Sequence, residues 1–227
     1  MRSHTSTRSR TRAHHYAVAV AVALALALAA IALAACRSSV STDQATTPPS
    51  TGSTAAVSTP GIVIGPGAQS TYTVQRQPDP GTCHYRTTGG DTLPDPACTP
   101  GAVNPQVTQA TIGSTICRSG WTSTIRPPSS ITGAEKRGSA AAYNYTGSFS
   151  TGEYDHLIPL ELGGDPNDPA NLWVQPNDRP GATSTYNSKD TLESVLRRLV
   201  CSGTLTLTAA QSAIATDWVT ALHNYAD

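Results

Sequence analysis

The composition of the first 70 residues limits how much of this 227-residue chain can form a core. Residues 17–34 are an unbroken apolar run, and residues 37–70 consist mainly of Ser, Thr, Pro, Gly and Ala, with almost no aromatic or charged side chains. The second stretch can bury too little apolar surface to offset its chain entropy, so we expect it to be a disordered tether. Roughly 150 residues remain, which suits one domain over residues 71–227.

The apolar run also indicates where the protein resides. It follows an Arg-rich leader without acidic residues, which is the layout of a secretory signal. It ends at Leu33 to Cys36 (LAAC), which resembles the bacterial lipobox, in which the cysteine receives a lipid. The alternative is a transmembrane anchor, since about 18 apolar residues can span a bilayer. We therefore predict a lipoprotein signal over residues 1–36, lipidation at Cys36, and export to the outer face of the cell membrane or secretion.

The cysteines that follow Cys36 indicate a disulfide-stabilised domain. Their number is even, as expected for disulfides in an exported chain, and none of their spacings matches the C-x-x-C pairs of a zinc site. Four cysteines permit three pairings, among which the sequence cannot choose. We favour Cys83 with Cys98 and Cys117 with Cys201.

The charge distribution excludes a broadly basic nucleic-acid-coating protein. Four of the 15 basic residues lie in the first 36 positions, so from Arg37 onward 11 basic residues face 15 acidic ones, a net charge of −4. Broad attraction to phosphates requires clustered Lys and Arg. Contact with nucleic acid would therefore depend on a local groove and a metal ion.

Local patterns predict a mixed α+β fold with little strand. A short hairpin is expected around residues 154–162, closed by Gly163 and Gly164. N-cap and capping-box signals, followed by helix-favouring or apolar residues at helical spacing, predict helices. These helices are expected over residues 104–113, 132–143, 187–203, and from 208 to near the C-terminus.

One string carries most of the chemical information. It runs from Asp155 to Gly164 (DHLIPLELGG) and is followed by Asn171. It resembles the first and middle parts of the HNH, or ββα-metal, nuclease motif, over a core of about residues 153–196. The segment from Lys189 to Glu193 (KDTLE) and the residues after it resemble the tail of exported bacterial HNH-like proteins. The resemblance implies a small ββα-metal motif embedded among short helices.

The resemblance assigns roles to three residues. It implies that His156 is the general base, for which a neutral imidazole is suited because its ordinary pKa lies near working pH. Asp155 would ligate a hard cation, Mg²⁺ or Mn²⁺. Asn171 would hydrogen-bond backbone across the loop and fix the His156 strand; the alternative is an ordinary turn or cap asparagine.

The chain departs from the family pattern at the second metal ligand. Many HNH motifs place a histidine at the start of the helix, but no histidine lies between His156 and His223. Asn187 could substitute as a metal ligand, and Lys189 or Glu193 could contact phosphate or a metal-bound water.

These observations predict an exported, membrane-tethered, metal-dependent endonuclease that acts on DNA, or on RNA. The expected partners are the nucleic acid and the membrane, reached through the lipid anchor; no protein partner is inferred. The alternative is a catalytically degenerate cell-surface lipoprotein in which the same fold serves binding or structure. His84 and His223 are expected on the surface, and the tryptophans in the core. For Arg197 and Arg198 a solvated helix face and a phosphate contact remain equally open.

Overall fold

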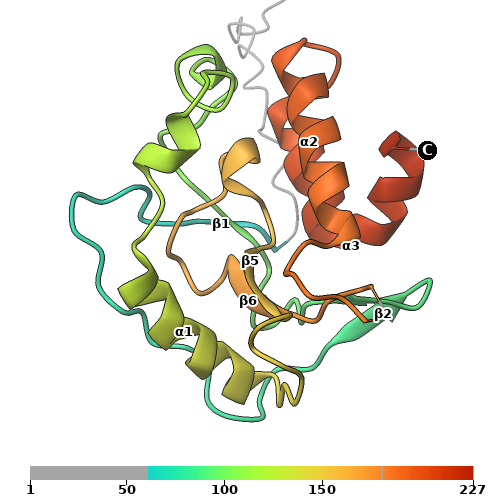
Figure 1. Cartoon of the computed structure of the whole chain (residues 1–227). Coiled ribbons are helices and arrows are strands. Elements are labelled where there is room, and N and C mark those ends of the chain that lie inside the picture. Colours follow the sequence, from blue (N-terminus) through green and yellow to red (C-terminus); the bar gives the residue numbers. More distant parts are fainter. Residues whose placement is uncertain (1–60, 180, 227) are drawn as a thin grey trace, which may run out of the picture. The chain divides into compact units, whose positions relative to one another are not determined.

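A computed structural model describes residues 61–179 and 181–226 of the chain, which fall in one compact unit (Figure 1). The predicted signal, the lipidation site Cys36 and residues 37–60 of the predicted tether lie outside the described residues. Within the described ranges, no helix has the length and apolarity required to cross a membrane.

The described part is a mixed α+β domain, as predicted. Its strands form three two-stranded sheets, of which β1–β4 is parallel and β2–β3 and β5–β6 are antiparallel. The strands are β1 (Val63–Ile64), β2 (Arg86–Thr88), β3 (Asp91–Leu93), β4 (Ala102–Val103), β5 (Glu153–His156) and β6 (Leu172–Gln175). The helices are α1 (Ser129–Ala142), α2 (Ser188–Cys201) and α3 (Leu207–Ala226), with 3-10 turns η1 (Ile112–Ser114), η2 (Trp121–Thr124) and η3 (Leu160–Leu162).

Residues 61–70 belong to the fold, so the predicted tether boundary at residue 70 is wrong. The Val63 N–H donates to the Gly101 carbonyl at 2.9 Å, and the Gly65 N–H donates to the Val103 carbonyl at 2.9 Å. The Gly67 N–H donates to the buried carboxylate of Asp165 at 2.6 Å. Composition reports how much side-chain surface a segment can bury, whereas this segment is held mainly through its backbone.

Two apolar clusters form the core. In the first, α2 and α3 pack together, and every fourth residue of α2 from Leu192 to Val200 is fully buried. In the second, Trp173 and Val174 of β6 pack with Tyr143, at the end of α1. In Figure 1 the β5–β6 hairpin consequently lies between α1 and the α2–α3 pair.

Both predicted C-terminal helices are present, but the capping box predicted from Thr208 to Gln211 is wrong, because Thr206 caps α3 and the Gln211 side chain donates to the Leu162 carbonyl at 2.8 Å. Helix α2 starts after Asn187, whose backbone N–H donates to the Asp190 carboxylate at 2.8 Å, as in a capping box. Helix α3 begins at Leu207, where Thr206 Oγ1 accepts from the Ala209 N–H at 3.2 Å. Its backbone leaves helical geometry at Asp217, so the two parts of α3 meet at a kink.

The two upstream helix predictions are less accurate. Residues 104–111 form turns before η1, because the Asn104 side chain accepts from the Gln106 N–H at 2.9 Å and closes a local turn instead of an α-helix. Helix α1 starts at Ser129, three residues before the predicted capping-box residue Thr132. Glu135, which should have completed that box, instead accepts from the Gln75 N–H at 2.8 Å.

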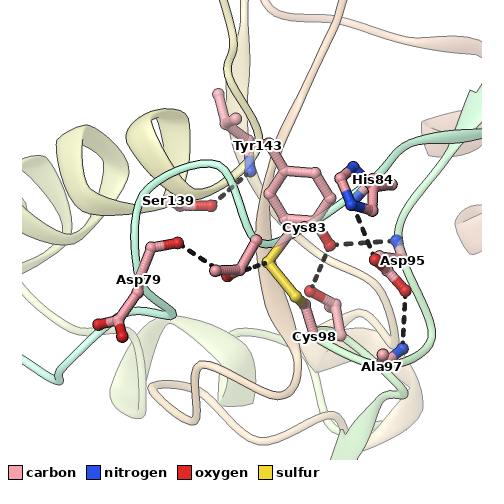
Figure 2. The surroundings of a disulfide bond; sticks show 11 residues. Asp79, Cys83, His84, Asp95, Ala97, Cys98, Ser139 and Tyr143 are labelled. Atoms are coloured by element: carbon pink, nitrogen blue, oxygen red, sulfur yellow. Dashed lines mark hydrogen bonds between the residues drawn. A yellow bond between two sulfur atoms is a disulfide. The ribbon is translucent and has the colours of Figure 1, made fainter.

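Both predicted disulfides are confirmed, Cys83 with Cys98 and Cys117 with Cys201. Figure 2 shows the first one beside the Tyr143 ring, with the Asp95 carboxylate accepting from the backbone N–H groups of His84 (2.8 Å) and Ala97 (2.9 Å). This disulfide and these hydrogen bonds close the loop before β4, and the N–H groups of Cys83 and Asp95 hold it against the end of α1 by donating to the Ala142 carbonyl and the Tyr143 hydroxyl at 3.1 Å each. The second disulfide joins the segment between η1 and η2 to the last residue of α2.

Candidate functional site

The site is assembled from strand β5 and the first turns of helix α2. Side chains two apart on a strand share a face, which places Glu153 and Asp155 on the same side of β5. Side chains three and four apart on a helix are neighbours, which groups Lys189, Asp190 and Glu193 on one side of α2. Strands β5 and β6 precede α2 along the chain. The acidic side chains of β5 and α2 line one pocket.

Asn171 holds the segment that follows His156. Its Oδ1 accepts from the N–H groups of Ala102 (3.3 Å) and Ile158 (3.0 Å), and its Nδ2 donates to the carbonyls of Ile158 and Asp165 (3.0 Å each). The side chain is fully buried, and all four of its hydrogen-bonding positions are used. Asn171 therefore acts through the backbone as a positioning residue, and it does not line the pocket described below.

The two glycines of the motif make this tight loop possible. Gly163 has φ +75°, a conformation that favours glycine. A Cβ on Gly164 would overlap the Ile158 carbonyl oxygen, the same group that Asn171 binds. Gly164 thus lets the loop close onto the end of the His156 strand, and the antiparallel partner, β6, follows only at Leu172.

The imidazole of His156 is held in one tautomer. Its Nε2 lies 3.1 Å from the Pro166 carbonyl oxygen, which can only accept, so Nε2 carries the proton of the neutral ring. Burial lowers the pKa of His156 to about 4, and the nearby charges of Arg126 and Lys189 act in the same direction, against Asp155. The ring is therefore neutral at physiological pH, with Nδ1 as its basic nitrogen.

Lys189 lies beneath the site as a fully engaged cation. Its Nζ donates to Asp155 Oδ2 (2.8 Å), Glu193 Oε1 (2.6 Å) and the His156 carbonyl oxygen (2.8 Å), which uses all three of its hydrogens. Burial alone would lower the pKa of Lys189, but the two carboxylates outweigh it and raise this pKa. Only 1% of the side chain is exposed, so Lys189 positions Asp155 and the end of β5 and is not placed to reach a substrate phosphate.

A pocket of about 150 Å³ opens over Asp155 and His156. Its lining is dominated by carboxylates from three elements, with one arginine. The lining residues are Arg126, Glu153, Tyr154, Asp155, His156, Pro159, Leu160, Glu161, Asp190 and Glu193. Burial and neighbouring carboxylates raise the pKa of Glu153 to about 7, and burial raises that of Glu193 to about 8. Five carboxyl groups line the pocket, against the two positive charges of Arg126 at its rim and Lys189 beneath it, which favours the entry of a cation.

Asn187 is not brought to Asp155 as a second ligand. It is the N-cap of α2 and is not among the residues that line the pocket. Its Oδ1 accepts from the Asp178 N–H at 3.1 Å, and its Nδ2 donates to the Thr185 carbonyl (3.0 Å) and to Glu153 Oε2 (3.4 Å). One lone pair of the oxygen that would bind a metal is therefore used by the backbone.

The donor types of the pocket fit a hard divalent cation held by few protein ligands. Carboxylate oxygens are the ligands that Mg²⁺ and Mn²⁺ prefer, and Asp155 and Glu153 present them from one face of β5. Among the described residues, no group of three or more His, Cys, Asp or Glu side chains is arranged to hold a metal ion. Mg²⁺ commonly keeps several waters and uses one or two carboxylates together with substrate phosphates, so such a sparse set is compatible with it.

Four charged residues that line the pocket were not predicted as site residues from the sequence: Arg126, Glu153, Glu161 and Asp190. Glu153 could have been found from its position two residues before Asp155. Arg126 carries no such signal, because tertiary packing alone brings it to the motif.

The other histidines, the tryptophans and Arg197 lie outside the pocket. His84 and His223 are exposed, and Trp173 and Trp218 are buried in the core, whereas Trp121 is only partly buried and packs against the core. Arg197 donates from Nε to the Ile116 carbonyl at 2.9 Å, so it connects α2 to the segment next to Cys117.

Comparison of the chain with protein-family models, with curated proteins and with solved structures finds no match. What the site can do is therefore inferred from its own residues and from the motif resemblance.

The raised pKa of Glu153 gives a pH-dependent prediction. Between the ordinary value of 4.5 and about 7, the unfolded chain releases this proton while the folded chain keeps it, so stability falls as pH rises through that window. We compare the free energy of unfolding of Glu153→Gln with that of the unsubstituted chain. The variant's value should rise by about 2 kcal/mol relative to the unsubstituted chain when the pH is raised from 4.5 to 8, after allowance for solvent screening. Urea unfolding in EDTA at both pH values measures this difference.

A Glu161→Gln variant carries the same chemical change at the same pocket and isolates the general effect of removing one negative charge. If the free energies of unfolding of Glu153→Gln and the unsubstituted chain differ by the same amount at both pH values, the pKa of Glu153 is not raised by folding.

Proposed function

We propose that this protein is an exported, membrane-tethered, metal-dependent endonuclease that hydrolyses phosphodiester bonds in DNA, or in RNA. The observation that carries the proposal is the pairing of Asp155 and His156 at one acidic pocket, with the neutral imidazole fixed by the Pro166 carbonyl. The resemblance of residues 153–196 to the HNH motif supports the same conclusion.

The chain's own groups match the tasks of phosphodiester hydrolysis. In its neutral form, His156 can accept the proton of an attacking water at Nδ1, while its Nε2–H remains on the Pro166 carbonyl. Lys189 keeps Asp155 oriented from beneath, and Asn171 keeps the loop closed behind His156. A divalent cation, when bound, supplies the positive charge that stabilises phosphate oxygens in the transition state.

Export is supported by the N-terminal sequence and by the disulfides. The apolar run and Cys36 predict a lipoprotein signal, and two disulfides are typical of proteins that fold in an oxidising compartment. The membrane is then the partner of the N-terminal lipid, and nucleic acid is the partner of the pocket.

Cleavage of supercoiled plasmid by the purified full chain tests the catalytic proposal. We expect nicking in Mg²⁺ or Mn²⁺, none in EDTA, and a loss of at least about 100-fold in His156→Ala, the scale of a general base. His84→Ala is the matched control, because His84 is an exposed histidine that does not line the pocket. Equal cutting by the unsubstituted chain and His156→Ala, or no cutting by either across several divalent metals, would reject the proposal.

The second candidate is a binding or structural lipoprotein without catalysis. It is favoured by the Lys189 ammonium, which occupies Asp155 Oδ2, and by the backbone contact that occupies Asn187 Oδ1. Calorimetric titration with Mg²⁺ and Mn²⁺ separates the two candidates. The endonuclease requires binding that Asp155→Asn weakens, whereas a structural domain shows no binding that depends on Asp155.

A further inference from the structure

Arg126 occupies a stiff segment at the rim of the acidic pocket. It lies between η2 and α1, flanked by the buried residues Ile125 and Pro127. The Tyr72 hydroxyl donates to the Ile125 carbonyl at 2.5 Å, and the Pro128 carbonyl accepts from the N–H of Ile131, in the first turn of α1, at 2.9 Å. Two consecutive prolines restrict φ directly after Arg126. The backbone therefore fixes where this side chain starts, while the side chain itself is exposed.

The guanidinium has no partner of its own in the part of the chain that the structure describes. No hydrogen bond and no ion pair within 4 Å engages it, although it lines the same pocket as the carboxylates of Glu153, Asp155 and Glu193. Lys189, by contrast, forms ion pairs with the carboxylates of Asp155 and Glu193. Arg126 is thus the cation of this pocket that remains free to bind something from solution.

The surroundings of Arg126 indicate which class of ligand its guanidinium binds. Arg126 and His156 line the same small pocket. A nucleic acid that approaches the pocket meets several carboxylates, which repel its phosphates, so a fixed positive charge next to the base is needed to hold one phosphate there. A guanidinium suits this task, because its planar fork binds two phosphate oxygens at once.

We propose that Arg126 binds a phosphate of the nucleic-acid substrate at the rim of the pocket, next to His156. The inference rests on the proposed endonuclease function and adds the residue that seats the substrate. It also explains how a chain with net negative charge after its leader binds a polyanion: through one placed arginine together with the cation site, without a basic face.

Binding of a fluorescently labelled duplex of about 20 base pairs tests the inference. The full chain with His156→Ala serves as the background, in EDTA, so that neither cleavage nor metal affects the readout. In this background, Arg126→Gln is expected to weaken the Kd several-fold and to reduce the slope of log K against log salt concentration by about 0.9, the value for one phosphate contact. Arg126→Lys keeps the charge and should retain the slope while losing part of the affinity.

Arg137→Gln is the matched control, since Arg137 is an exposed arginine of α1 outside the pocket. The inference is overturned if Arg126→Gln leaves both Kd and slope unchanged, if Arg137→Gln causes the same losses, or if the background chain does not bind the duplex. Plasmid cleavage that depends on His156, together with duplex binding that does not depend on Arg126, leaves the endonuclease proposal standing and removes this inference. Binding that depends on Arg126 without any cleavage supports the phosphate site and rejects catalysis.

Discussion

Replacement of Lys189 with methionine is expected to destabilise the fold by about 3–5 kcal/mol at pH 8, the cost of removing one partner from a buried ion pair. The substitution keeps the aliphatic volume but leaves the carboxylates of Asp155 and Glu193 and the His156 carbonyl without their shared donor. Because these groups lie in or behind the pocket, we also expect plasmid cleavage to fall with the loss of Asp155 orientation.

The loss should depend on pH in a defined direction. Burial already raises the pKa of Glu193, and Lys189 is the group that opposes this rise, so the pKa of Glu193 increases further in the variant. An acid whose pKa is raised by folding is most favourable at low pH and loses that stability as pH rises through the folded value. The difference between variant and unsubstituted chain should therefore grow as pH rises through about 8, the pKa of Glu193 in the unsubstituted chain, and be larger at pH 9 than at pH 5, as measured by urea unfolding.

Lys136→Met is the matched control, because the chain has two lysines and Lys136 is the other one. Its Nζ donates to the backbone carbonyls of Phe149 and Gly152 at 2.6 Å each and hydrogen-bonds to no carboxylate, although the charge of Glu153 acts to raise its pKa. We expect a loss of about 1 kcal/mol there, with little change between the two pH values. Equal losses from the two lysine variants at pH 8 would show that the buried ion pairs of Lys189 contribute nothing specific.

The sequence predicted best where a local pattern decides the structure. Helix α2 combines a cap at Asn187 with apolar residues four apart, and both signals lie within the segment itself. The disulfides were predicted in part by counting, because four cysteines in an exported chain allow only three pairings. The hairpin prediction was correct in kind, but β6 begins only at Leu172, because Asn171 and Gly164 close a longer loop than the glycines alone suggest.

The sequence predicted least where contacts between segments far apart in the chain determine the structure. Residues 61–70 are ordered by the backbone of residues 101–103 and by Asp165, which no composition rule detects. The same limit applies to the site: the adjacency of Asp155 and His156 was visible in the sequence, whereas Arg126 lies 29 positions before Asp155. Whether Lys189 faces a substrate or a buried carboxylate depends on how α2 packs, and the sequence left that open.

Removal of the Cys117–Cys201 disulfide is expected to destabilise the protein by about 4–5 kcal/mol, the chain-entropy value for a loop of this length. The two cysteines are 84 positions apart, so the bond restricts about half of the described chain in the unfolded state. Cys83 and Cys98 are only 15 positions apart, and the same relation gives about 3 kcal/mol for their disulfide. Urea unfolding of a Cys117→Ala, Cys201→Ala double variant measures the loss.

Thiol treatment provides the internal control for this prediction. Cys201 is exposed, so dithiothreitol should reach this disulfide in the native protein, and reduction should lower the stability of the unsubstituted chain toward that of the double variant. The Arg197 hydrogen bond to the Ile116 carbonyl spans the same junction and remains after reduction, which should keep α2 in place at moderate temperature. A loss below about 1 kcal/mol in the double variant would mean that Arg197 and the α2–α3 core, and not the disulfide, determine how the N-terminal half of the domain is held to α2.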